Sequence, residues 1–191
     1  MPRLVLASAS PRRLDLLARI GVVPDAVVPA DIDESPARAE LPVHYARRIA
    51  RAKALAVQAS EGGSVILAAD TVVAAGRRIL PKTEDEDEAR RTLGLLSGRR
   101  HRVLTAVTLI DEAGAQRHRL STSVVAFKRF SDAELDEYLA SGEWRGKAGA
   151  YAIQGRAEAL VRQIYGSHSG IVGLPLFETR ALLIAAGYPL S

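Results

Sequence analysis

The sequence predicts an α/β fold with a partly antiparallel sheet, in one domain that spans residues 1–191. Strand-like and helix-like patterns alternate along the chain without a linker, an internal repeat or a low-complexity segment. Two strand-like stretches, near residues 102–110 and 121–127, are joined by a polar turn around Gly114, which is typical of an antiparallel pair. Hydrophobic residues make up 48% and charged residues 25%, so the composition is that of a globular protein with a substantial core.

The first element is a strand over the apolar residues 4–6, followed by the sequence "ASASPRR" at 7–13. Ser10 is a favourable helix N-cap, and Pro11 suits the first helical position. Apolar residues then recur at helical spacing until Gly21, which ends the helix. The start of the chain therefore predicts a strand, a tight loop and a helix.

The next elements surround a second apolar strand. Residues 22–36 contain several prolines and the acidic sequence "DIDE", which indicates an extended loop. An amphipathic helix is expected after Pro42, and Lys53 falls on its apolar face. The run "SVILAADTVVAA" at 64–75 then predicts a buried central strand, with a hairpin at the "GRR" of 76–78.

Two capping-box patterns predict the helices of the second half. Thr83 with Glu86 opens a helix to about residue 96, and Ser131 with Glu134 opens one that ends at Gly142. The acidic run that begins the first of these helices complements the helix dipole and is assigned no chemistry. The rest of the chain predicts a glycine-rich segment "KAGAYAIQG", a short strand over "ALVRQI", a second glycine-rich turn and a last helix over residues 175–186.

The composition excludes several classes of site. The chain contains no cysteine, which excludes a disulfide framework, a thiol nucleophile and a thiolate metal site, and which fits a reducing compartment. No segment approaches the ~18 apolar residues of a membrane span, and the apolar stretch near the start is too short for a signal peptide. We therefore expect a cytoplasmic protein with no membrane partner.

The charge favours anionic partners. The chain carries 26 basic and 22 acidic residues, a net charge of +4, and phosphates are the obvious class of anion. Aromatic residues make up only 5%, and no segment interleaves basic and aromatic side chains as a base-stacking surface would. This pattern argues against a nucleic-acid partner. A non-catalytic regulatory or nucleic-acid-binding module stays as an alternative.

Asp70 is the most informative single residue, because it is a carboxylate inside the apolar run "ILAADTVV". Burying an unpaired carboxylate costs on the order of several kcal/mol, so a metal ion, a role as general base or a cationic partner is expected. The structural alternatives are an ion pair with a nearby lysine or arginine, and an Asx turn that ends the strand. We favour a functional role for this carboxylate.

Basic residues indicate a phosphate site. The helix that begins after Ser10 offers backbone N–H groups to an anion, and Arg12 and Arg13 add guanidinium groups. Lys53 and Lys82 are candidate phosphate-binding ammonium groups. The alternatives are an ordinary helix start with solvated arginines, and lysines whose ammonium groups reach solvent. The glycine motifs of P-loop and dinucleotide-binding proteins do not occur.

Acidic residues indicate a metal site. Asp31, Asp33 and Glu34 lie in the proline-bounded loop, and alternation places the two aspartates opposite the glutamate. Their oxygens suit Mg²⁺ or Mn²⁺ that bridges to substrate phosphates, although an acidic loop alone is more often only solvated. The 4 histidines show no metal-ligand spacing, and no nucleophile elbow of a serine hydrolase is present. Metal-assisted hydrolysis is therefore the chemistry that these residues favour.

Seven sequence motifs, in order, resemble those of the Maf family, the septum formation inhibitor-like nucleotide pyrophosphatases. They are "SASPRRLDLL", "DIDE", "ARAKA", "AADTVV", "LSGRRHRVLTAV", "GAYAIQG" and "GIVGLPL", which together extend over essentially the whole chain. The resemblance implies an inosine triphosphatase-like α/β fold, with a mixed, elongated sheet, flanking helices and two lobes around a cleft. It also implies a cytoplasmic homodimer that hydrolyses a nucleoside triphosphate substrate between the α and β phosphates with a divalent metal cation, Mg²⁺ or Mn²⁺.

The resemblance also implies roles for particular residues. Asp70 matches the catalytic base, and Glu34 with Asp70 matches the metal-binding pair. The positions that match those around the phosphates are Ser8, Arg13, Lys53 and Lys82. Three further positions match the branch that prefers dTTP and UTP over 7-methyl-GTP, namely Arg12, Thr71 and Gln154. A 7-methyl-GTP pyrophosphatase is the alternative within the same chemistry.

Two positions depart from the family pattern, and one position raises a question of chemistry. Thr83 stands where the family usually has proline, and it is expected to cap the next helix. Gly170 stands where a small polar residue is usual, so any contact of that side chain and the rigidity of the loop around Ser167 come into question. Gln154 has an amide donor and acceptor that fit the O4 and N3–H edge of a pyrimidine, provided that neighbours hold the amide in one orientation.

Overall fold

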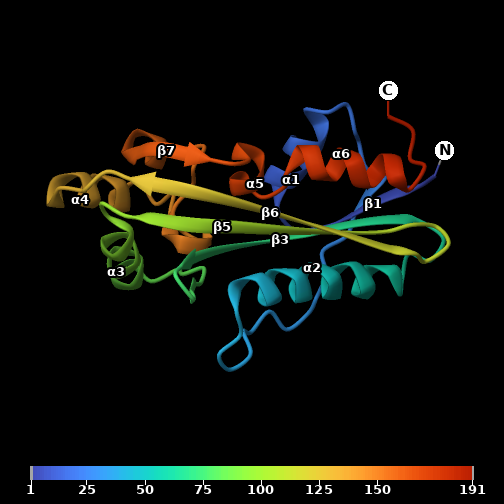
Figure 1. Ribbon diagram of the computed structural model, residues 1–191, viewed down its shortest axis with the longest axis horizontal. Helices are drawn as coiled ribbons and strands as arrows, with labels where there is room; N and C mark the ends of the chain where they lie inside the picture. Colours follow the sequence, from blue (N-terminus) through green and yellow to red (C-terminus); the bar gives the residue numbers. More distant parts are fainter. Residues whose placement is uncertain (1, 191) are drawn as a thin grey trace.

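The computed structural model describes residues 2–190 and confirms a mixed α/β architecture around one sheet of seven strands (Figure 1). The strand order is β2-β1-β3-β5-β6-β7, with β4 paired to β3 outside this path. Strand β1 is parallel to β2 and β3, and the other pairs are antiparallel. The strands are β1 (Leu4–Ala7), β2 (Ala26–Val27), β3 (Val65–Ala75), β4 (Arg78–Leu80), β5 (Arg100–Ile110), β6 (Gln116–Phe127) and β7 (Val161–Tyr165).

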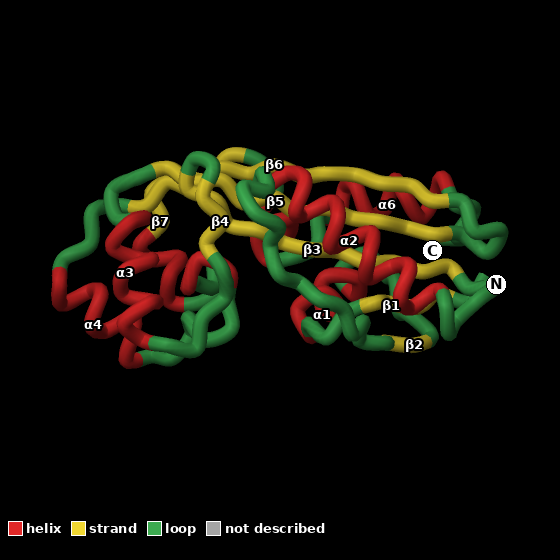
Figure 2. Tube along the Cα trace, turned by 90° about the horizontal axis from the view of Figure 1, so that it is seen from below, coloured by secondary structure: helices red, strands yellow, loops and turns green. Residues whose placement is uncertain are grey.

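Helices cover both faces of this sheet and define two lobes. Helix α2 lies below the sheet in Figure 1, and α1 and α6 lie above it; this end of the molecule is the first lobe. Figure 2 shows α3 and α4 gathered at the other end, with β4 and β7, which form the second lobe. The helices are α1 (Pro11–Ala18), α2 (Pro42–Gln58), α3 (Glu86–Leu96), α4 (Asp132–Ala140), α5 (His168–Val172) and α6 (Leu176–Ala185), with 3₁₀ turns η1 (Ala148–Ala150) and η2 (Arg156–Leu160).

The long strands β3, β5 and β6 connect the lobes, which gives the elongated sheet that the resemblance implied. In β3, side-chain alternation sends Ile66 and Ala68 toward α2, where they pack with Val57. The intervening residues Leu67 and Ala69 pack on the opposite face in the core that includes α1 and α6. Asp70 continues the α2 face of the strand, and its neighbour Thr71 belongs to the other face.

The cap of α3 differs from the prediction. Asp85, not Thr83, is the N-cap residue, and its side chain accepts a hydrogen bond from the backbone N–H of Glu88 at 2.7 Å. The hydroxyl of Thr83 instead accepts from the N–H of Asp85 at 3.1 Å and donates to the Glu88 carboxylate at 2.6 Å. Thr83 therefore orders the turn before the helix, and the capping box predicted with Glu86 is wrong. The second predicted box, Ser131 with Glu134, is confirmed at the start of α4.

The other differences between the predicted and the observed fold concern short elements. Strand β2 lies inside the segment predicted as an extended loop, and α5 lies inside a predicted glycine-rich turn. Strand β6 begins at Gln116, five positions before the apolar stretch that predicted it, because its first residues are polar and largely exposed. No helix within residues 2–190 is long and apolar enough to cross a membrane.

A buried histidine makes the stability of the second lobe depend on pH. His101 on β5 is 3% exposed, and its Nε2 lies 2.8 Å from the hydroxyl oxygen of Tyr151. Burial lowers the pKa of His101 from 6.5 to about 4. Between those values the unfolded chain binds more protons than the folded chain. The stability that this group contributes above pH 6.5 is therefore lost as the pH falls toward 4.

We expect this histidine to lower the free energy of unfolding by about 2 kcal/mol between pH 7 and pH 5. Urea denaturation at the two pH values measures the loss in the wild type and in His101→Phe, which fills similar space without a titrating group. The variant should lose about 2 kcal/mol less than the wild type over this interval. Equal losses in the two proteins would contradict the buried, neutral histidine.

Candidate active site

Residues from distant parts of the sequence meet where the two lobes join. Three adjoining pockets share Lys82, which follows β4. Helix α1 contributes Arg12 and Arg13, β3 contributes Asp70 and Thr71, and the segment before and after η1 forms more of the wall. Every residue to which the family resemblance gave a role lines at least one of these pockets: Ser8, Arg12, Arg13, Glu34, Lys53, Asp70, Thr71, Lys82 and Gln154.

Two carboxylates converge on the ammonium group of Lys53. The Nζ atom donates to Asp70 Oδ1 at 2.9 Å and lies 2.9 Å from Glu34 Oε1. Asp70 is 4% exposed and Lys53 is 7% exposed. The apolar face of α2 packs on the face of β3 that carries Asp70, which explains why the lysine and the carboxylate meet. Burial raises the pKa of Asp70, and the positive charges of Lys53 and Arg13 only partly oppose this shift.

Glu34 is held at the site by its backbone. The hydroxyl of Tyr45, on α2, donates to the Glu34 carbonyl oxygen at 2.7 Å. Burial opposes ionisation of the Glu34 side chain. The hydrogen bond and charge of Lys53, with Lys82 and Arg13, nevertheless lower its pKa. The Nζ of Lys82 lies 3.9 Å from Glu34 Oε2, and the Lys82 side chain is 59% exposed, so this lysine is available to a ligand.

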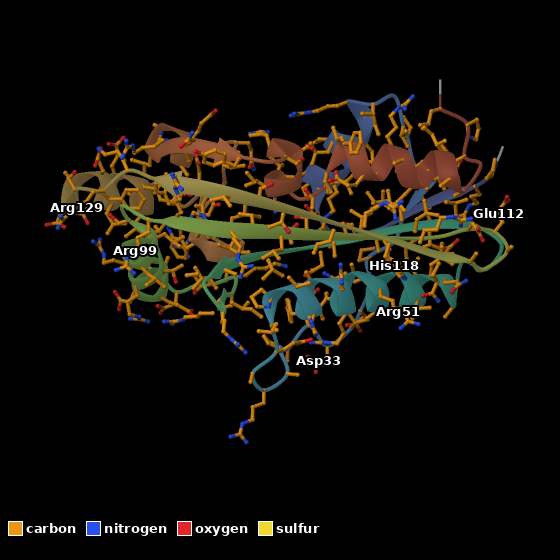
Figure 3. All side chains as sticks on the ribbon, in the orientation of Figure 1. Asp33, Arg51, Arg99, Glu112, His118 and Arg129 are labelled. Atoms are coloured by element: carbon orange, nitrogen blue, oxygen red, sulfur yellow. The ribbon has the colours of Figure 1, made fainter. Side chains whose placement is uncertain are left out.

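The two aspartates of the same loop line none of the three pockets, in agreement with the alternation that separates them from Glu34. Asp31 and Asp33 are exposed, and Figure 3 shows Asp33 on the loop beyond α2. The Asp33 carboxylate accepts a hydrogen bond from the N–H of Ser35 at 2.8 Å, which orders the turn. Glu34 is therefore the acidic residue of this loop that faces the cleft.

Arg13 is fixed in place, whereas Arg12 is not. Arg13 Nε donates to the Gly173 carbonyl oxygen at 2.9 Å, and its Nη1 donates to Ser8 Oγ at 3.1 Å. Ser8 also accepts from the N–H of Ser10 at 3.1 Å, so this hydroxyl ties the arginine to the turn before α1. Ser10 occupies the N-cap position as predicted, but its side chain makes no capping hydrogen bond. The half-buried Arg12 guanidinium makes no hydrogen bond or ion pair with any other residue between 2 and 190.

Thr71 and Gln154 line the same pocket as Arg12. The hydroxyl of Thr71 lies 3.0 Å from that of Thr105 on β5, the residue paired with it across the sheet. Gln154 is exposed, and its amide makes no hydrogen bond with another residue of the described chain. Within residues 2–190, no neighbour therefore holds this amide in one orientation by a hydrogen bond.

The donor set fits a hard divalent cation only in part. Glu34 and Asp70 present carboxylate oxygens to one point, now satisfied by Lys53. Within residues 2–190 no group of three or more histidine, cysteine or acidic side chains is arranged to hold a metal. Mg²⁺ commonly uses one or two carboxylates and takes its remaining ligands from water and substrate phosphates. This pair therefore suits a cation that arrives with a phosphate substrate.

The structure adds three residues that sequence reasoning missed. Lys147 lines the pocket of Arg12 and Gln154, and burial together with the charges of Arg12 and Lys82 lowers its pKa. Tyr45 holds the acidic loop, and Thr105 bonds the hydroxyl of Thr71. The signal for Lys147 was its place at the start of "KAGAYAIQG"; the other two depend on contacts across the fold that periodicity does not reveal.

The loop around Ser167 is ordered even though Gly170 stands where a small polar residue is usual. The N–H of Gly170 donates to Ser167 Oγ at 2.9 Å, and the N–H of Ser167 donates to Ser123 Oγ on β6 at 2.9 Å. A Cβ added at Gly170 would lie 3.1 Å from Ser167 Cβ and 3.2 Å from Ser121 Oγ, so a larger residue would require its neighbours to move. Hydrogen bonds to the hydroxyls of Ser167 and Ser123 therefore order this loop, although position 170 has no side chain.

Two dTTP/UTP pyrophosphatases resemble the chain over nearly its full length. A dTTP/UTP pyrophosphatase of Rhodospirillum rubrum is 64% identical over 185 residues, which cover 97% of this chain and 88% of that protein. A protein of the same name from Sphingopyxis alaskensis is 60% identical over 191 residues and covers 100% of both chains. These identities greatly exceed what a shared fold alone requires.

A solved structure shares the fold of the chain, and a family model matches most of its length. A HAM1 protein from Coxiella burnetii matches with a TM-score of 0.55 and 18% identity, covering 97% of this chain and 100% of that one, so the two share a fold. The family model described as Maf-like protein matches residues 3–186. With that match and relatives of this similarity, the chain belongs to the Maf family.

Proposed function

We propose that this protein hydrolyses nucleoside triphosphates, with dTTP and UTP preferred, to a nucleoside monophosphate and pyrophosphate. The observation that carries the proposal is the buried carboxylate of Asp70. Asp70 and Glu34 both contact the ammonium group of Lys53. The cleft around them is bordered by Arg13 and Lys82. Relatives at 64% and 60% identity carry the name of this activity, which supports the same substrate class.

The electrostatics of the cleft suit a polyanionic substrate. Its basic side chains are Arg12, Arg13, Lys53, Lys82 and Lys147, against the carboxylates of Glu34 and Asp70. The excess of positive charge attracts a triphosphate and offsets the charge that accumulates on a pyrophosphate leaving group. Arg13 supplies charge from a fixed position because its Nε and Nη1 are held by Gly173 and Ser8.

Asp70 is the base in the proposed reaction. A water oxygen forms a bond to the α phosphorus, the bond from this phosphorus to the α–β bridging oxygen breaks, and Asp70 accepts the proton of the water. The raised pKa of the buried carboxyl makes its ionised form a stronger base than an exposed aspartate. Arg13 and Lys82 then stabilise the departing pyrophosphate.

We also propose a divalent cation, Mg²⁺ or Mn²⁺, held by Glu34 and Asp70. When bound with substrate, such a cation neutralises phosphate charge and lowers the pKa of coordinated water. For that to happen, Lys53 must release at least part of its contact with the two carboxylates. Its long, flexible side chain allows the ammonium group to move toward the phosphates while its methylene groups stay packed.

A panel of triphosphates tests this function. The purified protein is assayed with dTTP, UTP, CTP, the purine triphosphates and 7-methyl-GTP, with Mg²⁺ or Mn²⁺ and with a chelator. We expect the highest kcat/KM for dTTP and UTP, pyrophosphate as product, and no turnover with the chelator. A preference for 7-methyl-GTP would place the protein in the other branch of the family. Inorganic phosphate as the sole product would contradict the proposal.

Arg12 and Arg13 are expected to give different defects. Arg13→Gln removes a fixed cation from the phosphates, so kcat/KM should fall for every triphosphate, by about 100-fold. Arg12→Gln should instead change the ranking of bases, because Arg12 lies in the pocket with Thr71 and Gln154 and is tied to no other described residue. Steady-state kinetics on the panel checks both, with thermal unfolding as the control for folding. Matching defects would contradict this division.

We further propose that the enzyme acts in the cytoplasm as a homodimer, without a nucleic-acid or membrane partner. The absence of cysteine from the chain and the resemblance to the family support this assignment. Sedimentation equilibrium at several concentrations measures the oligomeric state, and a monomer throughout would contradict the dimer.

A further inference from the structure

We propose that Thr105 is a positioning residue for base selection: it forces the hydroxyl of Thr71 to act as a hydrogen-bond acceptor toward the substrate pocket. An acceptor at this point selects the N3–H of uracil and thymine and disfavours the N3 of cytosine, which is itself an acceptor. This inference rests on the proposed function, because it assumes that the base of a pyrimidine triphosphate occupies the pocket of Thr71.

The direction of the hydrogen bonds follows from counting protons. Thr105 Oγ1 is placed to donate to either of two oxygens, the carbonyl oxygen of Gly170 at 2.7 Å and Thr71 Oγ1 at 3.0 Å, but its hydroxyl has a single proton. A carbonyl oxygen only accepts, so the single proton of the Thr105 hydroxyl is used by Gly170. The proton in the contact between the two threonines must then come from Thr71. With its proton committed, the Thr71 hydroxyl can offer only a lone pair to the pocket.

The rest of the fold holds this arrangement in place. Thr105 is 1% exposed and is paired directly with Thr71 in the ladder between β3 and β5. The carbonyl that takes its proton belongs to α5, whose first turn is fixed by the bond from the Gly170 N–H to Ser167 Oγ at 2.9 Å. Buried from solvent, Thr105 has no water to offer its proton instead. In a buried chain of hydrogen bonds of this kind, each hydroxyl keeps the same donor and acceptor partners.

The side chain of Thr71 borders the pocket that would hold the base. Thr71 lines the pocket that also contains Arg12 and Gln154. Gly173 lies beside it with φ +140°, and a Cβ added there would lie 3.8 Å from Thr71 Oγ1 and 3.7 Å from Arg13 Nε. The glycine therefore keeps the approach to the hydroxyl free for a ligand.

Gln154 does not carry this discrimination by itself. Its exposed amide has no hydrogen-bond partner among residues 2–190, so it can rotate to present either a donor or an acceptor to the base. By rotating, the Gln154 amide can form hydrogen bonds with uracil or with cytosine equally well. Thr71 differs because its polarity is set by Thr105 from within the sheet.

The test removes the Thr105 hydroxyl and then restores it. Thr105→Val keeps the shape of the side chain but frees the Thr71 proton, which can then be donated to N3 of cytosine. We expect the ratio of kcat/KM for UTP over CTP to fall roughly tenfold in this variant, and to return to the wild-type value in Thr105→Ser. The dissociation constants of α,β-methylene UTP and α,β-methylene CTP, measured by calorimetry, should change in the same ratio without turnover.

Thr108→Val is the matched control. Thr108 is also on β5 and 1% exposed, but its hydroxyl bonds His118 Nδ1 at 3.0 Å on the α2 side of the sheet. Figure 3 shows His118 there, in the groove that it shares with Arg51. The UTP-to-CTP ratio should be unchanged in this variant.

The outcomes separate the two proposals. A wild type that cleaves UTP but does not prefer it over CTP overturns the role of Thr105 and leaves the hydrolase intact. The same holds if Thr105→Val lowers kcat/KM for both substrates equally, because that pattern indicates a structural role. A wild type that cleaves no pyrimidine triphosphate overturns the proposed function and the role of Thr105 together.

Discussion

Asp70→Asn should reduce kcat by about 10³-fold with the metal and substrate saturating, since loss of a positioned general base costs 10² to 10⁴ in rate. Asparagine has nearly the same shape and keeps an oxygen for Lys53, so the fold should be preserved. It cannot accept the proton of the attacking water, and it is a poorer ligand for a cation. The loss should be the same for dTTP and UTP, because Asp70 acts on the phosphates and not on the base.

The control for this variant is its stability. Lys53 keeps Glu34 as a partner when Asp70 loses its charge, so thermal unfolding should stay cooperative and give a Tm near that of the wild type. Measured kcat for UTP in the two proteins then reports on chemistry. Turnover within twofold of the wild type would contradict the assignment of Asp70 as base.

Lys53→Met should destabilise the fold by about 3 kcal/mol, the lower end of the cost of removing one partner from a buried ion pair. The lysine is 7% exposed and Asp70 is 4% exposed, so the variant leaves a carboxylate in the core facing Glu34 without the cation that now lies 2.9 Å from each. Methionine fills nearly the same volume, so the loss reports mainly on charge. Chemical denaturation at neutral pH measures it.

Arg48→Met on the same helix is the matched control. Arg48 bonds Glu40 at 2.7 Å, but the arginine side chain is 42% exposed, and pairs of this kind contribute about 1 kcal/mol at most. The double variant Lys53→Met with Asp70→Asn should recover part of the stability, because no unpaired charge is then left at Asp70. A single Lys53→Met variant as stable as the wild type would show that the buried pair contributes nothing to folding.

The ion pair of Asp70 with Lys53 corresponds to the structural alternative that the sequence left open for Asp70, an ion pair with a lysine or arginine, although the sequence did not name Lys53 as the partner. A lysine on the apolar stripe of a helix and an aspartate inside an apolar strand both need a partner, and an opposite charge is the simplest one. Side-chain alternation in the acidic loop predicted that Glu34 lies on the opposite side from Asp31 and Asp33. The strand, helix and hairpin pattern of the larger elements followed from hydrophobic alternation in the same way.

Other features could not be predicted, because they depend on contacts between distant residues. The role of Thr105 depends on a carbonyl 65 positions later in the chain, and no local pattern indicates which way a hydroxyl donates. Thr83 and Asp85 are both favourable N-caps, and local sequence does not indicate that Asp85 caps the helix while the Thr83 hydroxyl bonds the Glu88 carboxylate. Helix α5 is only five residues long and contains a glycine, so its pattern resembles that of a turn.

The products of UTP cleavage in ¹⁸O-labelled water test the central claim most directly. Water attack at the α phosphorus, with Asp70 as base, predicts UMP that carries one labelled oxygen and pyrophosphate that carries none. Mass spectrometry of the two products after a single turnover measures the label. Release of UDP and inorganic phosphate instead would contradict the account, because it would place the attack at the far end of the triphosphate.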